Sequence, residues 1–250
     1  MTIPTQRLEK INIAKLKVAC STCTLRELCL PIGLNAVDLE KVDAIINRRQ
    51  QYKPGRHVYR TGDLFQFLYA IRLGSFKTYE LNKDGREQVS GFHMAGELIG
   101  LDAISNDTHA CSAVALEDSE ICEIPFIKLE GLIREIPTLQ RQFHRLMSRE
   151  ITSDHRLMML LGTLTAEERL ATFLSNLSER LQVRGLSPRT IHLTMSREDI
   201  GNYLGLKLET VSRMFSKFQE DGLIEVDRRN VKIKNLEALK RIAECNKPQR

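Results

Sequence analysis

The amino-acid sequence predicts an α+β protein in which an antiparallel β-roll or jelly roll precedes one long helix and a winged helix-turn-helix. Between residues 51 and 125, short apolar runs are separated by glycine- and proline-containing turns about ten residues apart, which is typical of an antiparallel sandwich. From residue 137 onward the apolar spacing becomes that of a helix. After residue 196, two short helical patterns flank a glycine and lead into a strand–turn–strand pattern.

Composition favours a globular chain with room for two domains. Of its 250 residues, 42% are apolar and 28% are charged. No apolar run reaches the length of about 18 residues that a membrane span needs, and residues 1–17 lack the apolar core of an export signal. We therefore expect a cytoplasmic protein with no membrane partner.

The net charge of +5 lies mostly in the C-terminal third of the chain. Residues 162–250 contain 16 basic and 12 acidic side chains, or +4, which leaves +1 for the remainder. A basic excess of this size is a weak indication of nucleic-acid binding.

The first 30 residues form a distinct segment with three cysteines in ten positions: Cys20, Cys23 and Cys29. Soft sulfur ligands at this spacing favour zinc or an iron–sulfur cluster, with packed thiols or a thiol switch as the plainer alternative. A tetrahedral sulfur site needs a fourth ligand. Cys111 and Cys122 both fall in the predicted sheet and spacing does not choose between them, whereas Cys245 in the C-terminal tail is a poor candidate.

Residues 31–136 are expected to form a β-roll sensor domain. Asn35 is a suitable N-cap for a helix at 36–47, and Asp84-Gly85 suits a tight hairpin. The runs with the length and composition of strands are 57–59, 67–71, 75–81, 88–93, 112–115 and 120–124.

Residues 137–161 are predicted to form an unbroken helix through which two copies of the chain pair. One stripe follows alternating steps of four and three residues, the spacing of a coiled-coil seam. This seam consists of Gln140, His144, Met147, Ile151, Asp154, Met158 and Leu161. A second stripe can pack on the chain's own sheet: Leu139, Phe143, Leu146, Glu150 and Leu157. The alternative is a single wide apolar face on the core helix of a monomer.

Asp154 on the seam makes pairing conditional. Two carboxylates that face each other across a dimer axis repel, so association needs a further favourable contribution. This arrangement is typical of a homodimer whose formation is regulated.

Residues 162–250 are predicted to form a DNA-binding domain. Ser196 is a suitable N-cap for its first short helix, Gly205 makes the turn, and Gly222 ends the second short helix. The other predicted elements are helices at 166–184 and 207–220 and strands at 190–194, 223–226 and 231–234. Two short helices followed by a basic hairpin are typical of a winged helix-turn-helix that binds double-stranded DNA.

The second short helix carries polar residues at its N-terminal end: Lys207, Glu209, Thr210, Ser212 and Arg213. Arg213 suits the guanine edge and Glu209 can accept a hydrogen bond from cytosine, each contact discriminating by about 1–3 kcal/mol. Phosphate contacts, which position the protein, are expected from Arg197, Lys217, Arg228 and Arg229. An ordinary helical domain with a solvated charged face is the alternative.

Two segments carry a resemblance to a known family. They are Leu193-Thr-Met-Ser-Arg-Glu-Asp-Ile-Gly-Asn-Tyr-Leu-Gly-Leu206 and Glu209-Thr-Val-Ser-Arg213. With the order of strands, long helix and winged helix-turn-helix, they resemble the cyclic-AMP receptor and fumarate–nitrate reduction regulator family. The cysteine spacing and Cys122-Glu-Ile-Pro125 are similar to its oxygen-sensing members.

This resemblance implies a ligand set, a mechanism and partners. The ligands of a [4Fe–4S] cluster would be Cys20, Cys23, Cys29 and Cys122. Oxygen would convert the cluster to a [2Fe–2S] form, with loss of the dimer and of DNA binding. Glu209, Ser212 and Arg213 would read the palindrome TTGAT-N4-ATCAA, and the loop at 81–87 would contact RNA polymerase.

Two other sensors of the same fold are less compatible with the residues. Gly96-Glu-Leu-Ile-Gly100 resembles the start of a cyclic-nucleotide phosphate cassette, but residues 87–127 contain no lysine or arginine to neutralise a buried phosphate. We therefore expect no cyclic nucleotide. Haem ligation by His57, His93 or His109 would leave the three N-terminal thiols unexplained.

A zinc- or thiol-based redox regulator of the same fold remains the alternative function. An enzyme finds little support, because the sequence has no glycine-rich phosphate loop, no Ser–His–Asp candidate set and no metalloprotease helix motif. We expect a protein that is not an enzyme.

Overall fold

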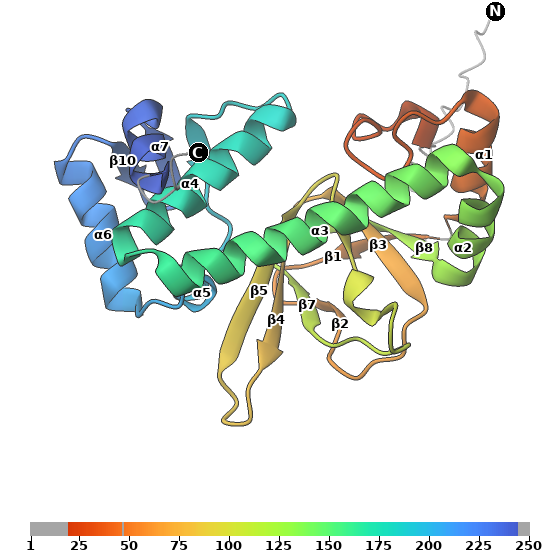
Figure 1. Ribbon diagram of the computed structural model, residues 1–250, viewed down its shortest axis with the longest axis horizontal. Helices are drawn as coiled ribbons and strands as arrows, with labels where there is room; N and C mark the ends of the chain where they lie inside the picture. The colour runs from red at the N-terminus through yellow and green to blue at the C-terminus, as the bar shows by residue number, and fades with distance from the viewer. Residues whose placement is uncertain (1–19, 47, 245–250) are drawn as a thin grey trace, which may run out of the picture.

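The structure is a computed structural model that describes residues 20–46 and 48–244. Figure 1 shows a strand-rich middle, a group of C-terminal helices on one side and the N-terminal helices on the other. The helix α3 (Pro137–Thr163) runs across all three parts. The predicted N-terminal arm and Cys245 lie outside the described residues.

The middle of the molecule is a sandwich of two four-stranded antiparallel sheets. One sheet has the order β1 (Arg48–Tyr52), β8 (Ser119–Pro125), β3 (Phe67–Leu73), β6 (Leu98–Ile99). The other has the order β2 (His57–Tyr59), β7 (Ser112–Ala115), β4 (Ser75–Leu81), β5 (Glu87–Met94). Side chains of both sheets, among them Tyr59, Ile71, Phe76 and Ile121, form one buried core. The predicted α+β class with a β-roll is confirmed.

The six predicted strands occur within two residues of their expected bounds. The hairpin between β4 and β5 lies at the expected turn, where Asn82 Oδ1 accepts from the N–H groups of Asp84 and Arg86. Two further strands were not predicted. β1 has the polar sequence Arg-Arg-Gln-Gln-Tyr and β6 has only two residues, so neither carries an apolar pattern.

Two helices, α1 (Ala36–Ile45) and α2 (Phe126–Glu135), lie at one end of the sandwich, and the long helix α3 begins there. α1 begins after Asn35 as predicted, since the Asn35 side chain accepts from the Asp38 N–H at 2.8 Å, and it ends two residues early. α2 was not predicted. α3 is unbroken as predicted and starts with Pro137, a residue suited to the first helical turn.

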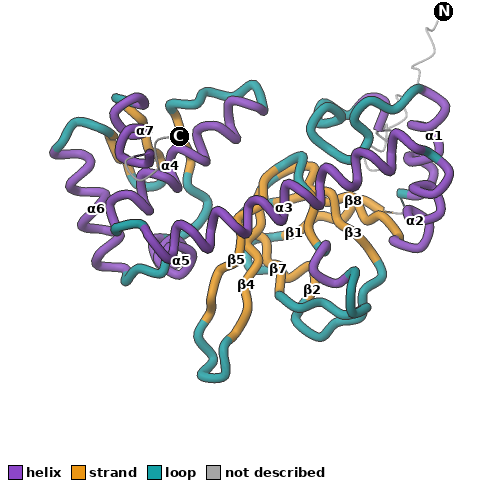
Figure 2. The backbone as a smooth tube through the Cα atoms, in the orientation of Figure 1, coloured by secondary structure: helices purple, strands orange, loops and turns teal. Residues whose placement is uncertain are grey.

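The C-terminal unit contains α4 (Ala166–Val183), β9 (Thr190–His192), α5 (Arg197–Leu204), α6 (Leu208–Glu220), β10 (Ile224–Asp227), β11 (Asn230–Ile233) and α7 (Leu236–Glu244). Ser196 and Asp199 form a capping box at the start of α5, and Gly205 has the left-handed φ of 63° that the turn to α6 requires. α7 was not predicted. Figure 2 shows the short strands of this unit among its helices.

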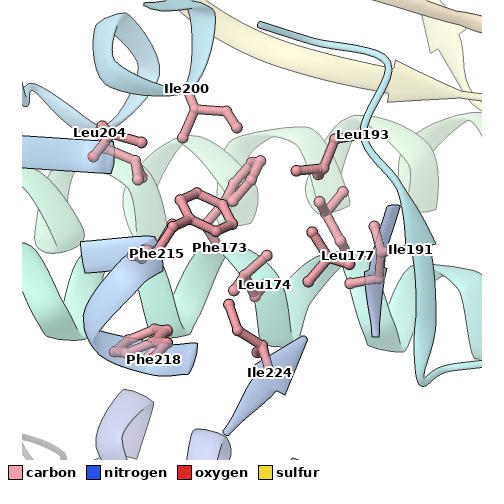
Figure 3. Close-up of a cluster of buried hydrophobic side chains, with 14 of the residues drawn as sticks. Phe173, Leu174, Leu177, Ile191, Leu193, Ile200, Leu204, Phe215, Phe218 and Ile224 are labelled. Carbon is pink, nitrogen blue, oxygen red and sulfur yellow. The ribbon is translucent and has the colours of Figure 1, made fainter. Parts of the chain in front are cut away.

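One apolar core holds the C-terminal unit together. Phe173, Leu174 and Leu177 of α4 pack against Ile200 and Leu204 of α5 and against residues of α6 and β10, as Figure 3 shows. This core leaves the opposite face of α6 in solvent. Among the described residues, no helix is both long enough and apolar enough to span a membrane.

Candidate functional site

Four cysteines from two separate segments line one small apolar cavity. Cys20, Cys23 and Cys29 come from the turns that precede α1, and Cys122 comes from β8. Much of the remaining lining is aliphatic: Leu25, Leu30, Val42, Ile46, Ile71 and Ile124. The structure therefore brings the three closely spaced thiols together with Cys122.

Short-range hydrogen bonds shape the cysteine segment. Its first turn is a 3-10 helix, Cys20–Thr22, whose Cys20 N–H donates to Asp43 Oδ1 of α1 at 2.9 Å. The Cys23 N–H donates to the Cys20 carbonyl at 3.2 Å, and the Cys29 N–H donates to the Leu25 carbonyl at 3.0 Å. These bonds hold a compact loop against α1 and β8.

The thiols of the cavity are electrostatically coupled. Burial raises the pKa of Cys20 to about 12, with further contributions from Asp43 and from neighbouring thiols. Burial also raises the pKa of Cys29 to about 12 and raises that of Cys122, which Arg49 opposes. A metal that binds here must therefore displace protons, so its affinity is expected to rise with pH.

Three arginines lie close to the cavity. Arg26 and Arg72 are part of its lining, and Arg72 is paired with Glu120 at 2.5 Å. Arg49 stands opposite Cys122 in the ladder between β1 and β8. Arg49 and Arg72 lower the pKa of Cys122 and so oppose part of the effect of burial on that thiol.

The other candidate fourth ligand lies elsewhere. Cys111 is 7% exposed within the sandwich core, where burial and Asp102 raise its pKa. Over residues 20–46 and 48–244, no three His, Cys, Asp or Glu side chains are arranged to hold a single metal ion.

Buried aromatic and imidazole rings stack in the interior of the sandwich. Tyr59 and His109 are buried and stack with their ring centroids 3.6 Å apart. His109 Nδ1 lies 3.5 Å from Asp102 Oδ1, so a carboxylate and not a cation accompanies the rings.

The long helix α3 has one buried and one exposed stripe. Leu139 and Phe143 are buried, on the stripe expected to face the sheet. On the seam, Ile151 is 54% exposed and Met158 is 61% exposed in the single chain. Of the remaining seam residues described above, His144 and Asp154 are exposed, while Met147 and Leu161 are half-buried.

An acidic neighbour accompanies Asp154 on α3. Burial raises the pKa of Glu150 to about 7, and Asp154 and Glu97 add to the effect. The Asp154 carboxylate therefore disfavours the charged form of Glu150.

The N-terminal half of α6 presents its polar side chains to solvent. Glu209, Ser212 and Arg213 are exposed, whereas Val211 and Phe215 are buried in the unit's core. Helical spacing places the three exposed residues on one face. This face is the one that a helix-turn-helix lays in the major groove.

The expected phosphate-binding residues differ in their surroundings. Arg228 and Arg229 are exposed in the wing turn, where Arg228 has a left-handed φ of 54°. The Arg197 guanidinium instead lies 3.2 Å from the ring centroid of Phe215, and burial lowers its pKa to about 10. Lys217 is paired with Glu167. Arg197 and Lys217 are thus engaged within the C-terminal unit.

Sequence reasoning missed the contacts between the sandwich and the C-terminal unit. Lys77 of β4 bridges Glu87 and Asp199 at 2.7 Å each, so the capping residue of α5 is bound to the sheet. Glu97 binds Arg180 of α4 and Arg184, the C-cap residue of α4, at 2.6 and 2.5 Å. The partners lie 83 to 122 positions apart, and no local pattern indicates them.

Known protein families match both the N-terminal and the C-terminal part of the chain. A family model for the cyclic nucleotide-binding domain matches residues 49–135, and one for the Crp-like helix-turn-helix domain matches residues 168–242. The structure of FixK2 from Bradyrhizobium japonicum is 31% identical and superposes with a TM-score of 0.73, covering 78% of this chain and 96% of that one.

Curated relatives match almost from end to end. The fumarate and nitrate reduction regulatory protein of Yersinia pestis is 44% identical over 99% of this chain and 99% of its own length. The transcriptional activator protein Anr of Pseudomonas protegens is 47% identical over 86% of this chain and 88% of its own. The chain therefore belongs to the fumarate and nitrate reduction regulators of the CRP/FNR family, which are DNA-binding transcription regulators and not enzymes.

Proposed function

We propose that this transcription regulator responds to oxygen through an iron–sulfur cluster held by Cys20, Cys23, Cys29 and Cys122. The observation that carries the proposal is the single cavity lined by all four thiols. Four thiolates are the usual ligands of a [4Fe–4S] cluster, and an apolar shell limits the access of solvent to it. When bound, such a cluster would supply the oxygen-sensitive iron and sulfide to which the regulator responds.

The cavity is joined to α3 by packing. Cys29 and Cys122 contact the apolar cluster that contains Leu139 and Phe143, and Met147 of the seam packs against the same cluster. Holding the cysteine segment on β8 therefore stabilises the support beneath the first half of α3. We infer that this support favours pairing along the seam against the repulsion of two Asp154 carboxylates. Each bias of about 1.4 kcal/mol changes the monomer–dimer equilibrium constant about tenfold, so a few kcal/mol are enough to switch occupancy.

Pairing brings two copies of α6 to a palindrome. In helix-turn-helix dimers the two recognition helices lie about 34–36 Å apart, one turn of DNA. Glu209, Ser212 and Arg213 would then read the half-sites of TTGAT-N4-ATCAA. Arg228 and Arg229 are exposed and can make phosphate contacts, although Arg229 Nη1 also donates to the Thr194 carbonyl at 3.3 Å. Arg197 and Lys217 would first have to leave Phe215 and Glu167.

The proposal also assigns a role to each segment of the chain. Residues 1–30 bind the cluster, 31–136 form the sensor domain, 137–161 form the dimer helix and 162–250 bind DNA. The exposed loop at 81–87 contacts RNA polymerase. The regulator acts in the cytoplasm, without a membrane or a cyclic nucleotide.

Anaerobic purification with a matched pair of variants tests the proposal. The parent protein should be brown, contain about four iron and four sulfide per chain, and bind the operator as a dimer in sedimentation and gel-shift measurements. Air should bleach it and release the operator. Cys122→Ser should abolish iron content and anaerobic operator binding, whereas Cys111→Ser should leave both unchanged.

Two results would contradict the proposal that the four cysteines hold an iron–sulfur cluster. A colourless protein that retains its metal in air would indicate the zinc-based regulator. A metal-free protein whose operator binding follows thiol oxidation would indicate the thiol-based one.

A further inference from the structure

We propose that Glu97 is a positioning residue that ties the cysteine segment to the DNA-binding unit through the turn at residues 94–97. This route reaches α4 directly and does not pass through the dimer seam of α3. That oxygen controls this link rests on the proposed function. The link itself is inferred from the contacts described below.

On one side of the turn, Arg180 of α4 and the C-cap residue Arg184 enclose the Glu97 carboxylate. Arg180 Nε donates to Oε1 at 3.1 Å, Arg180 Nη2 donates to Oε2 at 2.6 Å, and Arg184 Nη2 donates to Oε1 at 2.5 Å. The Arg184 side chain is 9% exposed and that of Glu97 is 29% exposed. A carboxylate between two largely desolvated guanidinium groups makes strong, directional bonds, and its removal leaves two positive charges side by side.

The same arginines also donate hydrogen bonds to backbone carbonyls of β5 and of the turn that follows it. Arg180 Nη2 donates to the Phe92 carbonyl at 2.7 Å, and Arg184 Nε donates to the Ala95 carbonyl at 2.8 Å. The Met94 N–H in turn donates to Glu97 Oε2 at 3.0 Å. Burial raises the pKa of Glu97, but Arg180 and Arg184 outweigh burial and hold that pKa below its ordinary value. The carboxylate therefore stays ionised and keeps both arginines in place.

On its other side, the turn touches the cysteine cavity by two contacts. The Gly96 N–H donates to the Ile71 carbonyl at 2.8 Å, and the Ile71 N–H donates to the Glu97 carbonyl at 2.9 Å; Ile71 is part of the cavity lining. Leu28, next to Cys29, packs on Gly96 so closely that a Cβ atom there would lie 2.8 Å from Leu28 Cβ. Gly96 also has a left-handed φ of 92°.

These contacts form one continuous path. A displacement of Leu28 or Ile71 moves the backbone of Gly96 and Glu97, and with it the carboxylate that holds α4. Because α4 forms the core of the C-terminal unit with α5 and α6, the orientation of the base-reading helix follows. Lys77 and Asp199 join the sheet to the same unit at a different place, and neither is part of the cavity lining or of the turn.

This difference supplies the control for the experiment. Glu97→Gln and Arg184→Gln each break the proposed path, one from the sheet side and one from the DNA side. Lys77→Met leaves that path intact and breaks the separate bridge to Asp199 of α5, together with the Lys77–Glu87 pair within the sheet. Full-length variants purified anaerobically are compared with the parent by hydrogen–deuterium exchange of the peptide that covers residues 25–30. Operator affinity, iron content and the sedimentation coefficient are measured on the same samples.

The proposal expects faster exchange at residues 25–30 in both Glu97→Gln and Arg184→Gln, by about tenfold, and no change there in Lys77→Met. Operator affinity should fall in both path variants by more than any change in the dimer fraction accounts for, which a role through α3 alone would not produce. Unchanged exchange at residues 25–30 in either path variant, or an equal increase in Lys77→Met, would overturn it. Because exchange is read on the polypeptide, the result holds whether or not iron is found, and absence of iron would contradict the proposed function instead.

Discussion

Arg169 sits at the joint between the long helix and the DNA-reading helices, and its replacement gives the sharpest test of the energetics. Arg169 Nη2 donates to the Leu161 carbonyl at 2.8 Å, Nε to the Leu164 carbonyl at 2.9 Å and Nη1 to the Leu204 carbonyl at 2.9 Å. Leu161 and Leu164 belong to the C-terminal end of α3, and Leu204 ends α5. One guanidinium thus binds the negative ends of two helices.

The magnitude follows from these three bonds. A hydrogen bond from a charged donor contributes about 1.5–3 kcal/mol when both partners are desolvated. Arg169 is only half-buried, and water can reach some of the carbonyls in the variant, so about 1 kcal/mol per bond is appropriate. Arg169→Met keeps much of the aliphatic stem and removes every donor. We expect it to lower the free energy of unfolding of the C-terminal unit by about 3 kcal/mol.

Urea unfolding followed by far-ultraviolet circular dichroism measures this loss. The midpoint should fall while the slope of the transition is kept, because the surface exposed on unfolding is unchanged. Hydrogen exchange should rise at residues 161–166 and at the end of α5. Lys217→Met is the matched control, since Lys217 forms a more exposed pair with Glu167 and should have a much smaller effect. The reasoning is refuted if Arg169→Met destabilises the chain no more than this control does.

Three further predictions concern DNA reading, pairing and pH. Arg213→Ala should weaken operator binding by about 1–3 kcal/mol and relax the preference at one base pair, whereas Arg228→Ala should weaken binding to all sequences alike and reduce its salt dependence; competition gel shifts with substituted operators separate the two. Asp154→Ala should raise the dimer fraction of cluster-free protein, and sedimentation equilibrium that finds the parent's monomer–dimer constant would exclude repulsion at the seam. His93, whose pKa burial lowers from 6.5 to about 4, takes up its proton more readily in the unfolded chain, so each pH unit between those values should remove up to about 1.4 kcal/mol of stability as the pH falls. Urea unfolding of His93→Gln should lack this part of the pH dependence, and a slope equal to the parent's would rule the histidine out.

Local chemistry explains why much of the fold could be predicted from the sequence. Asn35 and Ser196 cap the helices that follow them, and Gly205 makes a left-handed turn that other residues adopt at a cost. Such signals act over three or four residues and leave a trace in the sequence. The strand β1 has no such local signal, because its polar residues pair with β8 at the edge of the sheet.

The candidate cysteine site was only partly accessible to sequence reasoning. Spacing indicates that Cys20, Cys23 and Cys29 share a site, but it does not choose between Cys111 and Cys122. The pleat of β8 and the packing of the sheets bring Cys122 to the cavity of the three thiols, since Ile121 enters the sandwich core and Cys122 next to it faces the opposite side. Cys111 lies inside the sandwich.

By itself, the sequence determined the order of the elements, the three clustered thiols, the stripes of the long helix and the polar face of the reading helix, because each depends on neighbours within a few residues. Only the tertiary structure decided that Cys122 joins those thiols, that Arg197 lies against Phe215, and that Glu97 and Arg169 connect separate parts of the molecule. Such contacts join residues far apart in the chain, and their partners are set by how whole sheets and helices pack.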